Sequence, residues 1–274
     1  MLERPAVSVL VPAYNASAYI SLMLRSILSQ SLRDFEVLIV NDGSTDATSD
    51  ILRIEVDRRI RVITLPHHVG LSSALNIGIE SARGTFIARL DSDDLCMKDR
   101  LLRQYGEMNR RRSLVLLGTA AVIIDSSGAT TGHISVPLGT ANLIRRLRWR
   151  NSLIHPSVMF RRDAVLEAGG YSLASGHFED YDLWLRLACI GDIDNLGCPL
   201  IAYRRHVGQI TQKSMAVRRA MSVVGTSRQD MATARNESVL AAAVRHSIWV
   251  SAQRVRDLGR ARERTVGALR EPEV

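Results

Sequence analysis

The first half of the chain alternates short apolar runs with longer segments in which apolar residues recur at helical spacing. The runs are rich in β-branched side chains, which predicts buried parallel strands. These predicted strands are residues 7–11, 36–40, 61–65 and 86–90. The segments between them predict amphipathic helices at residues 19–30, 46–57 and 71–82. This alternation predicts an α/β domain with a mostly parallel, Rossmann-like sheet and helices on both faces.

The second half of the chain is less regular. Its predicted strands are residues 114–122, 130–135, 156–160 and 201–203, the first two joined by a turn at residues 126–128. A helix is predicted at residues 180–189, and the spacing stays helical from about residue 214 to residue 269. The pattern therefore predicts an α/β body followed by a helical extension.

The composition is that of a folded globular protein: 274 residues, 46% hydrophobic and 23% charged. This excludes a disordered chain and a small disulfide scaffold. The spacing of Cys96, Cys189 and Cys198 fits neither a zinc ribbon nor a redox motif, so we expect reduced thiols in a reducing, cytoplasmic compartment. No apolar run is long enough for a membrane-spanning helix, and Glu3 and Pro5 argue against a signal peptide.

The positive charge is concentrated at the end of the chain. The net charge is +8. Residues 204–274 hold 14 basic and 6 acidic side chains, whereas residues 1–203 hold 22 of each. A localised basic segment favours an anionic partner, either a phosphate-bearing substrate, a membrane surface or nucleic acid. The segment lacks aromatic interleaving and any recognisable reading motif, so we expect no nucleic-acid partner. The basic residues are mostly arginine rather than lysine. The base composition of the genome explains this preference as well as an anionic partner does.

Three polar loops follow the predicted parallel strands, at residues 12–15, 41–46 and 91–94. Sheets of this kind bind ligands at the carboxyl ends of their strands, so these loops mark the expected site. The GxGxxG turn of a dinucleotide-binding unit does not follow the first strand, and no Walker A loop is present. Nicotinamide dehydrogenases and P-loop ATPases are therefore disfavoured.

The strongest local signal is the group Asp91, Asp93 and Asp94, directly after a predicted strand. Carboxylates this close repel one another and need a counter-charge. Mg²⁺ or Mn²⁺ would supply it in a site that also holds phosphates. The alternative is an Asp-rich turn that caps a helix beginning near Lys98.

In the loop at residues 41–46, Asp46 predicts a helix N-cap, with a plain strand–helix turn as the alternative.

Eight short motifs, in this order along residues 5–212, resemble those of the family 2 glycosyltransferases. The motifs are Pro12-Ala13-Tyr14-Asn15, Asn41-Asp42-Gly43-Ser44-Thr45-Asp46, Ala74-Leu75-Asn76-Ile77-Gly78-Ile79, Leu90-Asp91-Ser92-Asp93-Asp94, His155-Pro156-Ser157-Val158-Met159, Gly169-Gly170-Tyr171, Glu179-Asp180-Tyr181-Asp182-Leu183-Trp184 and Tyr203-Arg204-Arg205-His206. The resemblance implies a GT-A fold, a nucleotide-diphosphate sugar donor and inversion of the anomeric carbon. It divides the chain into a nucleotide-sugar-binding half (1–112), an acceptor-binding half (113–212) and a basic helical extension (213–274).

The resemblance also assigns roles on the donor side. Donor-binding positions are Pro12, Ala13, Tyr14, Asn15, Asp42, Asp91, Arg204 and His206. Among them, Asp42 matches the residue that contacts the nucleobase, usually uracil, and Asp91 the residue near the ribose. Asp93 matches the ligand of a divalent metal, Mn²⁺ or Mg²⁺. The metal, Arg204 and a cationic His206 would stabilise the charge that develops on the departing diphosphate.

On the acceptor side, Asp180 matches the general base and Glu179 its neighbour. A carboxylate that removes the hydroxyl proton of the acceptor accelerates transfer by roughly 10²–10⁴-fold. His155 is a candidate for the acceptor site, with a structural role as the alternative. Trp184 could stack on a sugar ring, but a tryptophan at this spacing is more often part of the core.

These observations predict an enzyme that transfers a sugar, with uracil as the expected base of the donor, to a glycan or lipid-linked acceptor of the cell surface. A non-catalytic nucleotide-sugar-binding protein is the alternative, against which Asp93 and Asp180 argue. Nucleotidyl transfer, another reaction that uses metal-binding carboxylates, is disfavoured because it leaves the Glu179-Asp180 motif without a role.

The C-terminal extension carries an apolar stripe at helical spacing: Leu240, Val244, Ile248, Ala252 and Val255. It predicts a helix packed on the catalytic domain, a helix lying on an anionic inner membrane surface, or a homodimer contact.

Overall fold

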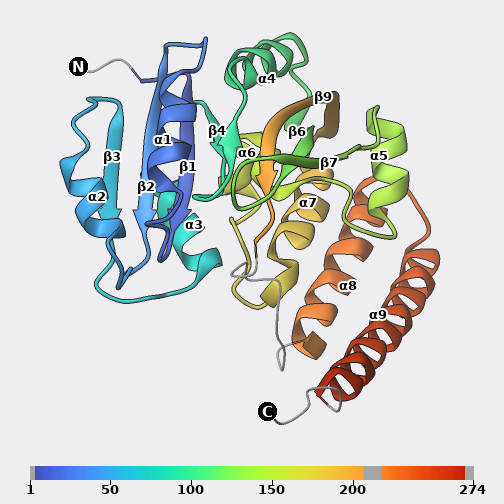
Figure 1. Ribbon diagram of the computed structural model, residues 1–274. Helices are drawn as coiled ribbons and strands as arrows, with labels where there is room; N and C mark the ends of the chain where they lie inside the picture. Colours follow the sequence, from blue (N-terminus) through green and yellow to red (C-terminus); the bar gives the residue numbers. More distant parts are fainter. Residues whose placement is uncertain (1–3, 207–216, 269–274) are drawn as a thin grey trace.

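The structure, a computed structural model, describes residues 4–206 and 217–268. Its strands are β1 (Val7–Ala13), β2 (Phe35–Asn41), β3 (Ile60–Thr64), β4 (Phe86–Arg89), β5 (Leu95–Cys96), β6 (Leu114–Ile124), β7 (Thr130–Ile134), β8 (Met159–Arg161) and β9 (Asp192–Arg204). Its α-helices are α1 (Ile20–Leu28), α2 (Thr48–Ile54), α3 (Leu71–Ser81), α4 (Arg100–Arg110), α5 (Thr140–Leu147), α6 (Arg162–Glu167), α7 (Glu179–Ile190), α8 (Val217–Ala234) and α9 (Val239–Ala268). The described strands form one sheet in the order β3-β2-β1-β4-β8-β6-β9-β5, with β7 paired to β6 (Figure 1).

The first half of the chain folds as its apolar pattern predicts. Strands β1 to β4 are mutually parallel, and β1 and β2 are buried along their whole length. Successive residues of a strand point to opposite faces, so Leu10 packs in one hydrophobic cluster and Val9 in the other. Helix α3 covers the first face and helix α1 the second. The prediction of helices on both faces is therefore confirmed.

The second half departs from the prediction in two places. The strand expected at residues 156–160 begins as a single 3-10 turn, His155–Ser157, and the strand itself is β8, which pairs antiparallel with both β4 and β6. The strand expected at residues 201–203 is the end of the much longer β9, which runs parallel to β6 and also pairs with β5. These pairings join the two predicted halves, residues 1–112 and 113–212, through a single continuous sheet.

The C-terminal extension forms two helices, separated by a break at which Asn236 adopts a φ of 55°. Helix α8 lies against α7, and α9 lies beside α8 (Figure 1). Val224 of α8 and Trp249 of α9 are buried in the same cluster as α7. The oxygen Oγ of Ser227 donates a hydrogen bond of 2.6 Å to the buried Asp182 of α7. The prediction of an extension packed on the catalytic domain is therefore confirmed for α8 and for one face of α9.

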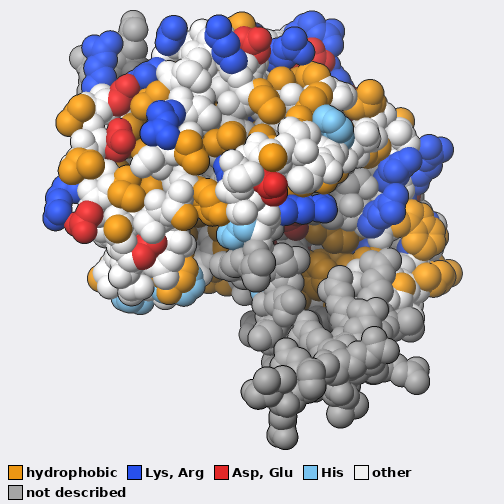
Figure 2. Space-filling model, in the orientation of Figure 1, with side chains coloured by type: hydrophobic (Ala, Val, Ile, Leu, Met, Phe, Trp, Pro, Cys, Tyr) orange, Lys and Arg blue, Asp and Glu red, His pale blue; other side chains and the backbone are white. Residues whose placement is uncertain are grey.

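The predicted apolar stripe is not the face of α9 that packs. Leu240, Val244 and Ile248 are 76%, 52% and 53% exposed, whereas Ala242 and Trp249 are buried. Figure 2 shows apolar and basic side chains at the right-hand edge, where the first turns of α9 lie in Figure 1. For the stripe itself, the alternative of packing on the catalytic domain is wrong, because the large Trp249 docks on α7 and α8 and turns the stripe outward. None of the described helices has the length and apolar character needed to cross a membrane.

Candidate functional site

The three polar loops meet at one edge of the sheet. They follow β1, β2 and β4, which are adjacent and parallel, so their carboxyl ends coincide. The backbone N–H of Asn15 donates to Oγ of Ser44 at 3.0 Å, and the backbone N–H of Thr45 donates to Oδ1 of Asn15 at 2.9 Å. Asp46 accepts backbone N–H bonds from Ser17 and from Thr48, the first residue of α2. Burial alone would raise the pKa of Asp46, but the bonds from Ser17 and Thr48 lower it to about 2.

Asp42 lies buried at the end of β2 and anchors the segment before α3. Its carboxylate accepts backbone N–H bonds from Val69 at 2.7 Å and Gly70 at 3.0 Å. Nδ1 of His68 lies 2.8 Å from the same carboxylate. The ring of His68 stacks on Tyr14, with centroids 4.0 Å apart. Pro12 and Ala13, by contrast, are buried within the end of β1, and Asn15 beyond Tyr14 is exposed. The structure thus brings an exposed aromatic pair next to a buried carboxylate.

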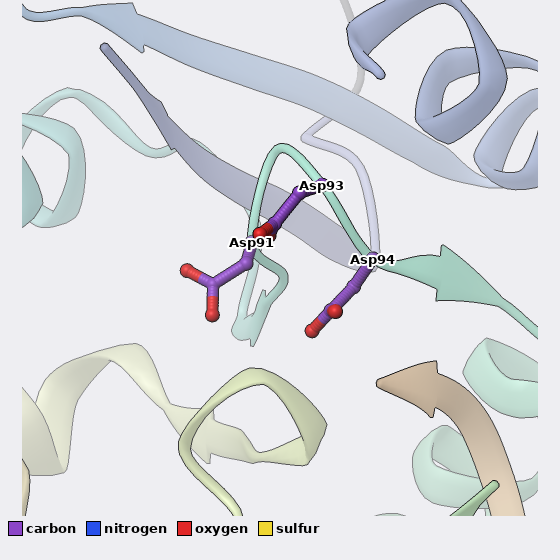
Figure 3. Close-up of side chains that lie close together, drawn as sticks. All are labelled: Asp91, Asp93 and Asp94. Carbon is purple, nitrogen blue, oxygen red and sulfur yellow. The ribbon is translucent and has the colours of Figure 1, made fainter. Parts of the chain in front are cut away.

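The aspartate group occupies the loop between β4 and β5. One ligand oxygen from each of Asp91, Asp93 and Asp94 lies within 4.8 Å of the others, and the side chains of Asp91 and Asp94 extend to the same side of the loop (Figure 3). Asp93 lies 3.0 Å from Nε2 of His206. Oδ1 of Asp94 accepts the backbone N–H of Arg204 at 2.7 Å. The fold therefore brings His206 next to Asp93, the residue expected to hold the metal.

The chemistry of this group fits a hard divalent cation. Asp94 is 0% exposed, and its Oδ2 has no hydrogen-bond partner among the described residues. Burial and the neighbouring charges of Asp91 and Asp93 hold the pKa of Asp94 well above its usual range. An added cation with oxygen ligands would relieve both the repulsion and the unpaired oxygen. Among the described residues, the three carboxylates contact Arg89, Arg204 and His206 rather than the first turn of α4, so a simple helix cap does not describe them.

Arg204 lies in a different place from the one expected of a diphosphate contact. The side chain is 1% exposed, and its guanidinium donates to the backbone carbonyls of Asp93 and Asp125, both at 2.8 Å. Its guanidinium carbon also lies 4.5 Å from the ring centre of Tyr19. Because these contacts hold the aspartate loop against the turn after β6, we assign Arg204 to the support of the loop.

Asp180 stands in the first turn of α7. Its Oδ2 accepts a hydrogen bond of 2.6 Å from Nδ2 of Asn151, and its Oδ1 accepts the backbone N–H of Tyr181 at 2.6 Å. Loss of solvent outweighs these bonds and raises the pKa of Asp180 to about 6. The pKa of Glu179 rises to about 7, first through burial and then through the charge of Asp180. A carboxylate with such a pKa takes up and releases a proton near neutral pH.

His155 and Trp184 lie side by side, with His155 partly exposed and Trp184 buried. Nε2 of His155 lies 2.8 Å from the hydroxyl oxygen of Tyr171, whose backbone is held in both directions by the side chain of Asn76. Burial and the nearby Arg89 hold the pKa of His155 well below its usual range, so the ring is neutral. Trp184 is 0% exposed, with its ring edge-on to that of His155. Trp184 is therefore part of the core, the more common of the two roles considered from the sequence, and not a stacking surface for an acceptor.

Arg89 is a site residue to which sequence analysis assigned no role. It ends β4, is 2% exposed and lies 2.5 Å from Asp91. Its Nε and Nη1 atoms have no hydrogen-bond partner among the described residues. Burial raises the pKa of Asp91, Glu179 and Asp180, and the charge of Arg89 opposes that rise at all three, so one buried cation serves both groups of carboxylates. The sequence did contain a signal for this role, because an arginine is unusual inside an apolar strand and this one lies two residues before Asp91.

A cavity of about 660 Å³ opens beside Asp180. Its lining includes Trp149, Asn151 and Phe178 and, from α9, Ile248 and Trp249. The C-terminal extension therefore contributes a wall of the candidate site. Periodicity alone did not reveal this, because the wall depends on how α9 docks onto α7 and α8.

The sequence of this chain matches those of known proteins. Residues 8–169 match the family model described as Glycosyl transferase family 2. The chain is 35% identical to the O-antigen biosynthesis glycosyltransferase WbnJ of Escherichia coli, over 76% of this chain and 82% of that protein. It is 31% identical to the amylovoran biosynthesis glycosyltransferase AmsE of Erwinia amylovora, over 67% and 70% of the two chains.

The fold is similar to that of S. aureus TarS 1–349, whose crystal structure was determined in complex with UDP-GlcNAc. The TM-score is 0.69 at 20% identity, and the match covers 84% of this chain and 71% of that one. The family match and the identity to WbnJ agree with the order of the motifs along the chain. The chain therefore belongs to glycosyl transferase family 2 and has the GT-A fold.

Proposed function

We propose that this protein is an inverting glycosyltransferase that uses a UDP-sugar and acts in cell-surface polysaccharide biosynthesis. The observation that carries the proposal is the pair of carboxylate groups, Asp91–Asp94 and Glu179–Asp180, arranged around the buried Arg89. The Asp91–Asp94 group would bind the cation of a nucleoside diphosphate, and the Glu179–Asp180 group would bind an acceptor hydroxyl. WbnJ and AmsE are both named for polysaccharide biosynthesis, and TarS was crystallised with UDP and with UDP-GlcNAc.

The donor would lie along the carboxyl edge of β1, β2 and β4. Asp42 and the ring of Tyr14 offer a polar group and a flat surface to the uracil, and the strand end at Pro12 and Ala13, with Asn15, flanks it. Asp91 would bind the ribose. Asp93, with the unpaired Oδ2 of Asp94 nearby, would hold Mn²⁺ or Mg²⁺. When bound, this cation supplies positive charge to the departing diphosphate.

Asp180 would act as the general base. It accepts the proton of the acceptor hydroxyl while that oxygen attacks the anomeric carbon and the bond to the diphosphate breaks. The hydrogen bond from Asn151 fixes the orientation of the carboxylate, and the pKa of about 6 leaves Asp180 mostly ionised at neutral pH. A single displacement inverts the anomeric carbon and needs no second carboxylate nucleophile. Glu179 and His155 would face the acceptor from the same side of the site.

The outer face of α9 is proposed to hold the enzyme at the inner surface of the cytoplasmic membrane, where a lipid-linked acceptor would be found. Leu240 and Val244 are more than half exposed, and the partly buried Arg245, 4.0 Å from Glu237, directly follows Val244 in the sequence. Apolar side chains flanked by arginine bind anionic lipid surfaces reversibly. In this arrangement no spanning helix is required.

The decisive experiment is a donor screen. Purified protein with Mn²⁺ is incubated with UDP-, TDP- and GDP-sugars, and slow hydrolysis of each donor is measured by release of the nucleoside diphosphate. Hydrolysis of a UDP-sugar supports the proposal. Binding of a nucleotide sugar without hydrolysis or transfer, under conditions in which Asp180 is ionised, would favour the non-catalytic binding protein instead.

A further inference from the structure

The three tryptophans of the chain differ sharply in exposure. Trp184 and Trp249 are 0% and 7% exposed, whereas Trp149 is 45% exposed. Trp149 is also one of the residues that line the cavity beside Asp180. A large aromatic side chain that stays accessible within a cavity, next to a candidate base, points to a ligand with a flat apolar face.

The segment that carries Trp149 is held in place by the C-terminal extension. The guanidinium of Arg228, which is 2% exposed, donates to the backbone carbonyl of Trp149 at 3.1 Å and to the hydroxyl oxygen of Tyr181 at 2.7 Å. The same guanidinium lies 4.6 Å from the ring centre of Trp249. One buried arginine of α8 therefore fixes a loop, α7 and α9 around the cavity. This is the arrangement of a site formed before its ligand binds.

The remaining lining residues define the chemistry of that ligand. Arg150, Asn151 and Gln253 provide hydrogen-bonding groups, and Ile248 adds an apolar contact from α9. A pyranose ring matches this combination, because its C–H face stacks on an aromatic ring while its hydroxyls bind amides and guanidinium groups. A lipid tail does not match it, since the amide and guanidinium groups would lose their hydration without new partners. The volume of about 660 Å³ lies in the range of small-ligand sites, roughly 300–1,000 Å³.

We infer that this cavity is the subsite for the terminal sugar of a glycan acceptor, with Trp149 as its stacking surface and α9 as its outer wall. The inference rests on the proposed glycosyl transfer, because it places the acceptor hydroxyl beside Asp180. It assigns a function to the C-terminal extension, whose helices hold Trp149 and close the acceptor side of the site.

The test separates acceptor binding from donor chemistry. The full chain and the variants Trp149→Ala and Trp149→Phe are assayed twice: for hydrolysis of the UDP-sugar in water, and for transfer to a panel of methyl and p-nitrophenyl pyranosides. We expect Trp149→Ala to keep donor hydrolysis and to raise the acceptor KM about tenfold, the equivalent of 1.4 kcal/mol, and Trp149→Phe to retain most of the affinity. An unchanged acceptor KM in Trp149→Ala would overturn the inference, as would an equal loss of hydrolysis and transfer in both variants.

A matched pair on α9 tests the wall. Ile248 and Leu240 both belong to the exposed stripe of α9, but only Ile248 lines the cavity, and Leu240 lies two turns earlier. Ile248→Ser should raise the acceptor KM severalfold, and Leu240→Ser should leave it unchanged. Equal effects of the two substitutions would assign the result to the surface of α9 as a whole and contradict an acceptor wall.

Tryptophan fluorescence gives a readout that does not depend on turnover. Acrylamide should quench mainly Trp149, and the pyranoside that serves as acceptor should protect it, with no protection in Trp149→Phe. If the wild type hydrolyses a UDP-sugar but no pyranoside of the panel is glycosylated or protects Trp149, the inference fails while the proposed function stands. If the wild type hydrolyses no donor, the proposed function fails. Protection by vesicles of anionic phospholipid instead of pyranosides would assign the cavity to lipid.

Discussion

The guanidinium of Arg89 lies 2.5 Å from the carboxylate of Asp91, although Arg89 belongs to a strand whose residues are all buried. Burying an arginine in such a strand removes its hydration, and the free-energy cost is large unless negative charge lies nearby. The candidate site provides that charge from two directions, with the Asp91–Asp94 loop on one side and Glu179 and Asp180 on the other. Arg89 therefore connects the donor and acceptor regions electrostatically.

Replacing this charge should change the pH dependence of the reaction. Arg89 lowers the pKa of Asp180, so Arg89→Met should raise that pKa and move the acid limb of the pH–rate profile to higher pH. It should also destabilise the fold by about 3 kcal/mol, because Asp91 loses its partner in a largely buried site. Urea unfolding and the profile of kcat against pH are the measurements. Arg89→Lys, which keeps the charge, is the control, and an unshifted profile in Arg89→Met would contradict the assigned role.

Asp93 should account for metal-dependent donor binding. By calorimetry, UDP should bind tightly with Mn²⁺ and weakly with EDTA, and Asp93→Ala should remove most of that difference because the cation loses a charged ligand. Asp99→Ala is the matched control, since Asp99 is exposed just before α4 and lies outside the cluster. Equal affinity of the wild type for UDP with Mn²⁺ and with EDTA would refute the metal site.

The ring of Tyr14 should contribute directly to nucleotide affinity. Tyr14 is 39% exposed and stacks on His68, beside the carboxylate of Asp42. Stacking of a base on an aromatic side chain contributes roughly 1–3 kcal/mol. Tyr14→Ala should therefore weaken UDP binding at least about fivefold, whereas Tyr14→Phe should preserve it. Similar affinities of the alanine variant and the wild type, measured by calorimetry with Mn²⁺, would place the base elsewhere.

The assignment of Asp180 as the base has a catalytic and a stereochemical test. Asp180→Asn should still bind UDP but lose transfer by roughly 10²–10⁴-fold, because the amide does not accept the proton. NMR of the product should show the anomeric configuration opposite to that of the donor. Retention of configuration, or an active Asp180→Asn enzyme, would overturn the assignment.

The same substitution has a predicted effect on stability. The pKa of Asp180 is about 6 in the folded chain and about 4 in an unfolded one, so the folded state binds this proton more tightly. Stability is therefore lost as the pH rises from about 4 through 6. Asp180→Asn should be more stable than the wild type at pH 8, by on the order of 1–2 kcal/mol, and equally stable at pH 4. Asp163→Asn, at an exposed aspartate in α6, should show no such difference.

The sequence predicted those parts of the protein that repeat a simple pattern. Strands β1 to β4 and their polar loops followed from apolar periodicity, because parallel strands place their carboxyl ends at one edge. The short α6 and the two-residue β5 carry too few residues for a periodic signal. The positions of Trp149 and Arg89 depend on contacts between residues far apart in the chain. For α9, the pattern identified an apolar stripe, but docking through Trp249 decided which face is buried.

The exposed stripe of α9 leads to the prediction on membrane binding. Each arginine near an anionic bilayer contributes about 1 kcal/mol, and this attraction is screened over roughly 10 Å at 0.1 M salt. The full chain should sediment with phosphatidylglycerol vesicles at low salt and be released at high salt. Removal of residues 214–274 is a poor test, because it would also remove the buried Val224 and Trp249. The double variant Leu240→Asp/Val244→Asp tests the surface directly and should lose most of the binding.

A matched control lies on α4, where Leu102 is 47% exposed and far from α9 in sequence. Leu102→Asp adds one negative charge at an exposed leucine and should leave vesicle binding nearly intact, so its comparison with the single variant Leu240→Asp isolates the stripe from net charge. A wild type that ignores the vesicles at low salt would exclude the membrane contact. If it then elutes as a dimer in gel filtration and the Leu240→Asp/Val244→Asp variant elutes as a monomer, the stripe is the interface between two copies of the chain.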